Sequence, residues 1–201
     1  MRIILVRHGQ TAWNVANRAQ GHSDEPLDAL GERQIAALAE ALSGERIRRI
    51  VSSDLSRARK TAETVAAKHG LEVELDPRLR ERSFGEWEGR AFEAIRKDVD
   101  DRVEAGHHPL EVCPPGGESV RDVWHRLAPV IESLRQERRP ILVSTHGMAK
   151  SILLAGLLGA DESVARAFRF GNTAISVVGL HGSNRVVLER YNDTRHLEGL
   201  E

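Results

Sequence analysis

Two histidines, each followed by glycine, stand where short apolar runs end. They occur in Val6-Arg7-His8-Gly9 and in Ser144-Thr145-His146-Gly147. A neutral imidazole can act as a nucleophile or as a hydrogen-bond donor, and glycine lets the backbone turn close to a ligand. If both runs are buried parallel strands, the two histidines lie at the same rim of one sheet. This pair is the first candidate for chemistry.

Two arginines are expected beside these histidines. Arg7 directly precedes His8, and Arg57 falls in the first turn of the helix predicted after a further strand, 49–52. Guanidinium groups match a phosphate dianion in bidentate geometry, and helix N-termini at the same rim add backbone donors. Together with His146, these residues predict a phosphoryl pocket that needs no metal.

Phosphoryl transfer also needs a proton donor for the leaving alkoxide. Glu81, Glu86 and Glu88 are close together in the chain, and their spacing alone does not choose among them. His107-His108 has no third ligand at a recognisable spacing, so we assign no metal. No glycine-rich dinucleotide fingerprint follows the first strand, and we expect no cofactor.

Alternating strands and helices are predicted to position these residues. Continuous apolar runs predict buried strands, alternation predicts an edge strand, and helical spacing of apolar residues predicts helices. Ser53 or Asp54 is the expected cap of the second helix, and Pro129 is expected to kink or break the fourth. The strands are expected at 3–6, 49–52, 71–75 and 141–145, with a hairpin of 175–180 and 185–191 as one option. The helices are expected at 30–42, from 55 to Gly70, at 92–103, from 119 to 134, and at 149–158.

This alternation predicts the α/β class. The expected architecture is a three-layer α/β/α domain with a mostly parallel central sheet and helices on both faces. Ligands of such sheets bind beyond the carboxyl ends of the strands.

Length and composition limit the remaining possibilities. The 201 residues suit one domain, and 29 Lys and Arg against 30 Asp and Glu give a formal net charge of −1. That balance offers no global basis for binding nucleic acid or a membrane. Cys113 is the only cysteine, so no intrachain disulfide is available. We expect a cytoplasmic protein whose partner is a small phosphorylated metabolite; the oligomeric state stays open, with a homodimer as one option.

Six motifs follow one another along nearly the whole chain. They are Arg7-His8-Gly9-Gln10-Thr11-Ala12-Trp13-Asn14, Ser52-Ser53-Asp54-Leu55-Ser56-Arg57-Ala58, Leu79-Arg80-Glu81, Phe84-Gly85-Glu86-Trp87-Glu88-Gly89, Gly116-Gly117-Glu118-Ser119 and Ser144-Thr145-His146-Gly147. In this order they resemble the histidine phosphatase superfamily, in its phosphoglycerate-mutase-like branch. The resemblance implies one histidine phosphatase domain over 1–201, with a short, lid-like variable insertion around 90–117.

The resemblance also implies a role for individual residues. The catalytic set would be His8 as nucleophile, Glu81 as proton donor, and Arg7, Arg57 and His146 around the transferred phosphoryl group. The substrate-binding wall would be Thr11, Asn14, Gln20, Gly21 and Gly147. The chain departs from the family pattern at Arg82, where an apolar residue is common, and we assign no role to Glu118 or Asn172.

The same core serves several reactions in the family, so the acceptor must be argued from the variable region. The segment 90–117 is short and mixed in charge, and it lacks the long basic insertion with which resembling mutases hold a second phosphate. We therefore expect water as acceptor and a metal-independent phosphatase that hydrolyses a small phosphomonoester through a phosphohistidine on His8. The alternatives are a cofactor-dependent phosphoglycerate mutase and a catalytically silent phosphate-binding or partner-binding protein on the same fold.

Overall fold

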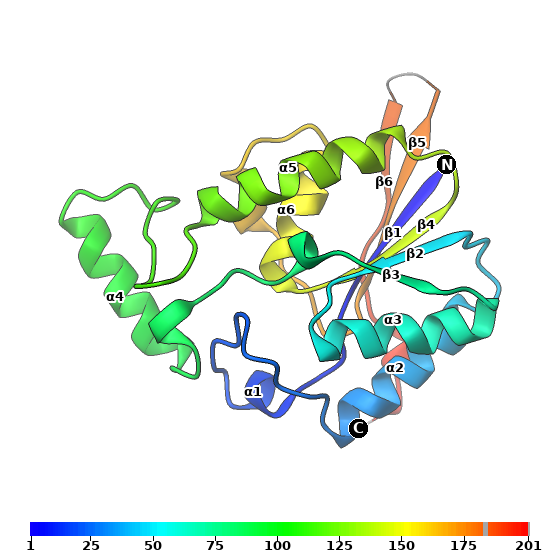
Figure 1. The fold of residues 1–201 in the computed structure, drawn as a ribbon, viewed down its shortest axis with the longest axis horizontal. Helices are drawn as coiled ribbons and strands as arrows, with labels where there is room; N and C mark the ends of the chain where they lie inside the picture. Colours follow the sequence, from blue (N-terminus) through cyan, green and yellow to red (C-terminus); the bar gives the residue numbers. More distant parts are fainter. Residues whose placement is uncertain (183–184, 201) are drawn as a thin grey trace.

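A six-stranded sheet with helices on both faces forms the body of the molecule (Figure 1). The computed structural model describes residues 1–182 and 185–200. The strands are β1 (Arg2–Arg7), β2 (Arg49–Ser52), β3 (Val73–Leu75), β4 (Ile141–Thr145), β5 (Ile175–His181) and β6 (Arg185–Asp193). The helices are α1 (Ala12–Val15), α2 (Ala29–Leu42), α3 (Ser56–His69), α4 (Phe92–Glu104), α5 (Val120–Gln136) and α6 (Gly147–Leu157).

The strand order is β3-β2-β4-β1-β5-β6. The first four strands of this order are mutually parallel, and β5 pairs antiparallel with both β1 and β6. The mostly parallel sheet is therefore confirmed, and the last two strands do pair with each other. The turn residues Ser183 and Asn184, which the sequence suggested for this pair, lie outside the described residues.

The apolar run of β1 is buried on both faces of the sheet. Ile3 and Leu5 belong to one core cluster, whereas Ile4 and Val6 belong to another. Successive side chains of a strand point to opposite faces, so a continuously apolar run needs a cover on each side. Side chains of α5 and α6 complete the first cluster, and those of α2 and α3 complete the second.

The prediction that Ser53 or Asp54 caps α3 is wrong. The N-cap residue is Leu55, which offers no side-chain cap, and the amide of Ser56 instead donates to the Asp24 carboxylate at 2.7 Å. Ser53 and Asp54 precede the cap position, and both side chains are engaged elsewhere. A carboxylate from a distant loop therefore supplies the acceptor that the first turn requires.

Of the two outcomes expected at Pro129, a kink or a break, the break is absent, because α5 runs unbroken through this residue. The ring removes one amide donor, which a long helix tolerates when its apolar face is well packed. Val123, Leu127 and Ile131 provide that packing against the core. No helix in residues 1–182 and 185–200 is long and apolar enough to cross a membrane.

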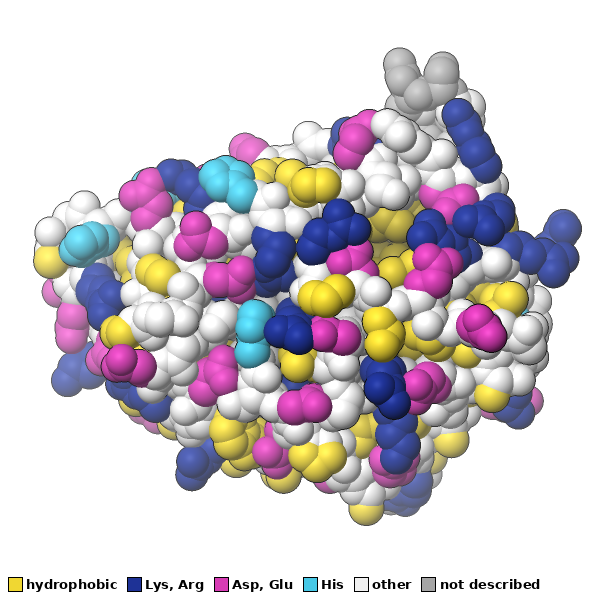
Figure 2. Space-filling model, in the orientation of Figure 1, with side chains coloured by type: hydrophobic (Ala, Val, Ile, Leu, Met, Phe, Trp, Pro, Cys, Tyr) yellow, Lys and Arg dark blue, Asp and Glu magenta, His cyan; other side chains and the backbone are white. Residues whose placement is uncertain are grey.

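The segment 90–117 stands apart from the sheet. It contributes α4, which lies at one end of the molecule (Figure 1). Its buried residues Ile95 and Val112 pack on Ala19, Phe84 and Trp87 in a small cluster separate from the two main ones. Over the face drawn in Figure 2, acidic and basic side chains are interspersed.

Candidate active site

The two histidines lie side by side at the carboxyl ends of β1 and β4. Their ring centroids are 5.1 Å apart, and both side chains are buried. β1 and β4 pair in parallel with Arg7 opposite Thr145, and the His8 amide continues the pairing by donating to Thr145 O at 3.0 Å. The parallel register therefore brings the two His-Gly pairs to one rim, as expected.

His8 is held as a neutral imidazole with one nitrogen free. Its Nδ1 lies 2.7 Å from Gly9 O. A carbonyl only accepts, so Nδ1 carries the proton and Nε2 keeps its lone pair. Burial, then the charges of Arg57 and Arg7, hold the pKa of His8 well below its usual 6.5. A neutral ring with a free Nε2 is a competent nucleophile.

Arg57 brings a buried positive charge to the same place. Only 1 % of it is exposed, and its terminal nitrogens donate to Ser23 O at 2.7 Å and Gly21 O at 2.8 Å. Burial is the main cause that lowers the pKa of Arg57 from 12.5 to about 10, so the group is still a cation at neutral pH. The two carbonyls fix its orientation without neutralising it.

Three buried nitrogens at this rim have no hydrogen-bond partner within the described residues. They are Nε of Arg7, Nε of Arg57 and Nδ1 of His146. The orientation of the Arg7 guanidinium is fixed by a hydrogen bond, because its Nη1 donates to Phe170 O at 2.7 Å. Buried polar groups are almost always paired, so three unpartnered nitrogens at one site indicate a binding site for a group that accepts hydrogen bonds. A phosphoryl group has the necessary oxygens.

His146 is oriented to donate rather than to attack. Its Nε2 lies 2.9 Å from Ser53 Oγ, and that hydroxyl already accepts from the Leu55 amide. No other recorded bond uses the Ser53 proton, so we assign it to His146 Nε2, and this assignment places the ring proton on Nδ1. Burial, followed by Arg57 and His8, lowers the pKa of His146 well below 6.5. The unpartnered Nδ1 is thus an N–H donor of a neutral ring.

Glu81 lies between Arg7 and the N-terminus of α6. Its carboxylate accepts from the amides of Met148 at 3.1 Å and Ala149 at 3.3 Å. A Cβ built on Gly147 would be 3.5 Å from Glu81 Oε2 and 3.9 Å from Arg7 Nε. Both are ordinary van der Waals distances, so Gly147 lies directly against the carboxylate and the arginine.

The residues expected to form the substrate-binding wall are distributed more widely. Gly147 lines the large cavity described below. Thr11 is buried and caps α1 together with Asn14, and Gly21 offers its carbonyl to Arg57. Gln20 is buried with its Oε1 unpartnered among the described residues. Of these five residues, the structure thus places Gly147 alone in the lining of that cavity.

Sequence reasoning missed the residues that hold the catalytic backbone. Asn172 Nδ2 donates to His8 O and to Asn14 Oδ1, each at 3.1 Å. Thr61 accepts from the Gly9 amide at 3.2 Å and donates to Arg57 O at 2.7 Å. Asn172 had no assigned role in the sequence because its partners lie more than 150 residues away in the chain.

Two glutamates support the loops that carry the site. Glu88 accepts from the amides of His22 at 2.8 Å and Ser23 at 2.9 Å, so it fixes the carbonyls that bind Arg57. Glu118 accepts from the Ser83 amide and pairs with Arg126, which in turn donates to Glu81 O at 3.1 Å. Glu118 therefore acts on the loop after Glu81 rather than on a substrate.

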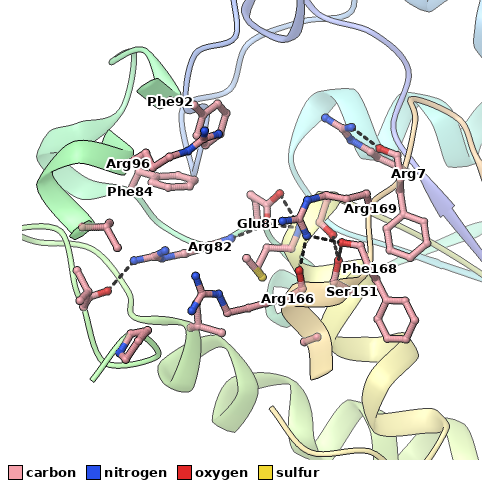
Figure 3. A pocket seen from close by; sticks show the side chains of 18 of the residues that line it. Arg7, Glu81, Arg82, Phe84, Phe92, Arg96, Ser151, Arg166, Phe168 and Arg169 are labelled. Atoms are coloured by element: carbon pink, nitrogen blue, oxygen red, sulfur yellow. Dashed lines mark hydrogen bonds between the residues drawn. The ribbon is translucent and has the colours of Figure 1, made fainter. Parts of the chain in front are cut away.

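A cavity of about 490 Å³ opens beside this rim (Figure 3). Arg7, Glu81 and Gly147 line its inner end. α4 contributes one side, and the segment 165–170 contributes the other. In residues 1–182 and 185–200 no group of three or more His, Cys, Asp or Glu side chains is placed to hold a metal ion.

Fold and site together define a class of protein. A buried neutral histidine, a buried and a half-buried arginine and a donor histidine at the carboxyl rim of an α/β sheet are the parts of a phosphoryl-transfer enzyme. The family model of the histidine phosphatase superfamily, branch 1, matches residues 3–194, so the chain belongs to that family.

Individual relatives divide between two activities. A probable phosphoglycerate mutase, GpmB of Yersinia enterocolitica, is 37 % identical over 98 % of this chain and 95 % of the relative. A mycobacterial glucosyl-3-phosphoglycerate phosphatase solved with VO3 is 34 % identical, with a TM-score of 0.83 over 95 % of this chain and 98 % of that one. A phosphoserine phosphatase mutant from Entamoeba histolytica solved with phosphoserine is 30 % identical, with a TM-score of 0.83 over 98 % of both chains.

Proposed function

We propose that this protein is a metal-independent phosphatase that hydrolyses a small phosphomonoester through a phosphohistidine on His8. The observation that carries the proposal is the trio of unpartnered donors, Arg7 Nε, Arg57 Nε and His146 Nδ1, beside the neutral His8 ring. Donors already in place where charge develops lower the barrier to phosphoryl transfer. The phosphatase titles of the similar solved structures support the same reaction.

The proposed reaction has two half-reactions. His8 Nε2 attacks phosphorus while the ester oxygen leaves and takes a proton from the carboxyl of Glu81. Arg7, Arg57 and His146 donate to the phosphoryl oxygens throughout. The Glu81 carboxylate then takes a proton from water, which attacks the phosphohistidine and releases inorganic phosphate and free His8.

A second candidate is phosphoglycerate mutase activity, which the names of the curated relatives favour. A mutase would return the phosphoryl group to a second hydroxyl of the same acid and would need priming by a bisphosphate. A coupled assay for interconversion of the two monophosphoglycerates, with and without a bisphosphate, separates the two candidates.

Incubation with a panel of sugar, amino-acid and glycerate phosphates is the direct test. We expect release of inorganic phosphate from at least one ester, and we expect it to persist in the presence of a chelator because side chains fill every charged role. No release across the panel would contradict the phosphatase proposal. Loss in chelator with recovery on adding a divalent ion would contradict the metal-free mechanism.

Glu81→Gln tests the proton donor. The amide keeps an oxygen for the α6 amides but supplies no acidic proton, so we expect kcat for alkyl phosphates to fall about 10²- to 10³-fold. For p-nitrophenyl phosphate, whose leaving group needs no proton, the loss is expected to stay below about 10-fold. The exposed neighbour Glu86→Gln is the matched control. Equal losses with both leaving groups would remove Glu81 from the acid role.

A further inference from the structure

The cavity beside the phosphoryl site is larger and more cationic than a phosphate alone requires. Its volume of about 490 Å³ is in the range of pockets that enclose a drug-sized ligand. Five arginines line it against two acids: Arg7, Arg82, Arg96, Arg166 and Arg169 against Glu81 and Asp100. Arg7 serves the phosphoryl group in the proposed mechanism, so the other four arginines need a separate explanation.

None of these four arginines forms an ion pair within the described part of the chain. Asp100 lies one helical turn from Arg96 on α4, so that side of the cavity has an acid among its lining residues, whereas segment 165–170 contributes none. Within residues 1–182 and 185–200, neither Arg166 nor Arg169 forms an ion pair, and the recorded side-chain bonds of Arg169 go to backbone carbonyls. Arg82 is buried against Val112 O and Glu118 O, and its charge adds to that of Arg166. This side of the cavity is therefore strongly positive.

The segment that carries these arginines is firmly held. Tyr191 Oη accepts from the Arg169 amide and donates to Arg169 O, both at 3.0 Å. Arg169 Nη1 donates to Phe168 O at 2.8 Å. The next residue, Phe170, accepts from Arg7. One short segment thus contacts Arg7 and carries Arg169, so the backbone that positions both arginines is held in place.

Aromatic rings flank the charged groups on two sides of the cavity (Figure 3). Phe84 and Phe92 meet edge to face on the α4 side, with centroids 5.7 Å apart. Phe168 lies on the opposite side, on the segment of Arg166 and Arg169, and Figure 3 shows the two sides facing each other across Glu81. Apolar surface with a few fixed charges selects a ligand that has both an apolar body and an anionic group.

We propose that the part of the substrate that leaves carries a second anionic group, a carboxylate or a phosphate, bound by Arg166 and Arg169, and an apolar body packed between Phe92 and Phe168. The inference rests on the proposed function, because it assigns the ester whose phosphoryl group His8 receives. On this proposal, residues 166–169 determine which substrate is preferred, whereas the catalytic residues act on the phosphoryl group common to all substrates.

Matched aryl esters test the charge directly. The pair is 4-(carboxymethyl)phenyl phosphate and 4-(carbamoylmethyl)phenyl phosphate, which differ in charge but hardly in size or leaving-group acidity. We expect kcat/KM to be at least about 10-fold higher for the carboxylate, chiefly through KM, because charge-assisted hydrogen bonds to arginine are strong. A 4-(phosphonomethyl)phenyl ester tells whether a second phosphate-like group is preferred to a carboxylate.

Replacement of the two arginines should remove this preference. In the Arg166→Gln/Arg169→Gln variant, the ratio of kcat/KM for the carboxylate ester to kcat/KM for the amide ester is expected to fall to about 1. Each single variant should have a ratio between that of the wild type and that of the double variant. Arg33→Gln, an exposed arginine on α2, is the matched control and should keep the ratio of the wild type. A ratio near 1 in the wild type, or one that the double variant retains, overturns the inference while leaving the phosphatase proposal intact.

Binding to a His8→Ala variant covers the case in which neither ester is hydrolysed. Calorimetry then compares the affinities of the two esters with and without the two arginine replacements. Tighter binding of the carboxylate ester that depends on Arg166 and Arg169 supports the subsite although the reaction differs from the one proposed. Equal affinities overturn the subsite as well.

Discussion

His8→Ala is expected to lower kcat at least about 10⁴-fold and to abolish the phosphoenzyme. The variant keeps the oxyanion donors but lacks the atom that receives the phosphoryl group, and loss of a nucleophile typically costs several orders of magnitude. A ³²P-labelled phosphomonoester, quenched on the millisecond scale, should label the wild type with the acid-labile, base-stable bond of phosphohistidine. The variant should carry no label.

His8→Asn separates loss of the nucleophile from loss of the fold. The asparagine amide can replace Nδ1 as donor to Gly9 O but has nothing at the position of Nε2. We expect the same loss of label as with alanine, at a melting temperature closer to that of the wild type. His125→Ala, an exposed histidine on α5, is the control and should label normally. Label on either His8 variant would assign the nucleophile elsewhere.

The lowered pKa of His8 explains why no base is needed to activate it. Burial and the charges of Arg57 and Arg7 destabilise the imidazolium, so the ring stays neutral at neutral pH and below. In the proposed mechanism, the two arginines that bind the phosphoryl oxygens therefore also keep the nucleophile His8 unprotonated. A single arrangement of charges serves both requirements.

The fold could be predicted because its signals are local. The run Ile3–Val6 is apolar at every position, and such a run is typical of a strand covered on both faces. Gly70 ends α3 with a φ of 62°, which glycine adopts readily. The prediction of the α3 cap failed because the acceptor for the first turn, Asp24, comes from a distant loop, while the Ser53 hydroxyl is hydrogen-bonded to His146. Local propensity carries no information on either contact.

The catalytic groups could be predicted by type, whereas their supports could not. His8, Arg57 and His146 lie together because three parallel strands end at one rim. The carbonyls that orient Arg57 and the Asn172 amide that binds His8 O depend on the tertiary fold. Arg166 and Arg169 lie in a short segment among apolar residues, and nothing in the sequence marks the two arginines as part of a cavity.

Arg57→Met is expected to lower kcat/KM about 10³-fold or more. Arg57 is the most deeply buried of the cations at the site, and arginines that stabilise phosphoryl transfer are typically worth 10³- to 10⁵-fold. Methionine fills much of the same space but donates no hydrogen bond. Arg57→Lys should recover little, because an ammonium cannot reach Gly21 O, Ser23 O and the phosphoryl oxygens in the same geometry.

A binding measurement distinguishes this role from a structural one. Inorganic phosphate should raise the melting temperature of the wild type by mass action, and Arg57→Met should lose most of that increase even where the variant is folded. Arg59→Met lies two residues further along α3, is exposed and pairs with Glu63, so it should retain both activity and the response to phosphate. If Arg57→Met kept the full response to phosphate while its activity fell, the guanidinium would not bind the phosphoryl group in the ground state. Its contribution would then be confined to the transition state, where the charge on the equatorial oxygens is redistributed.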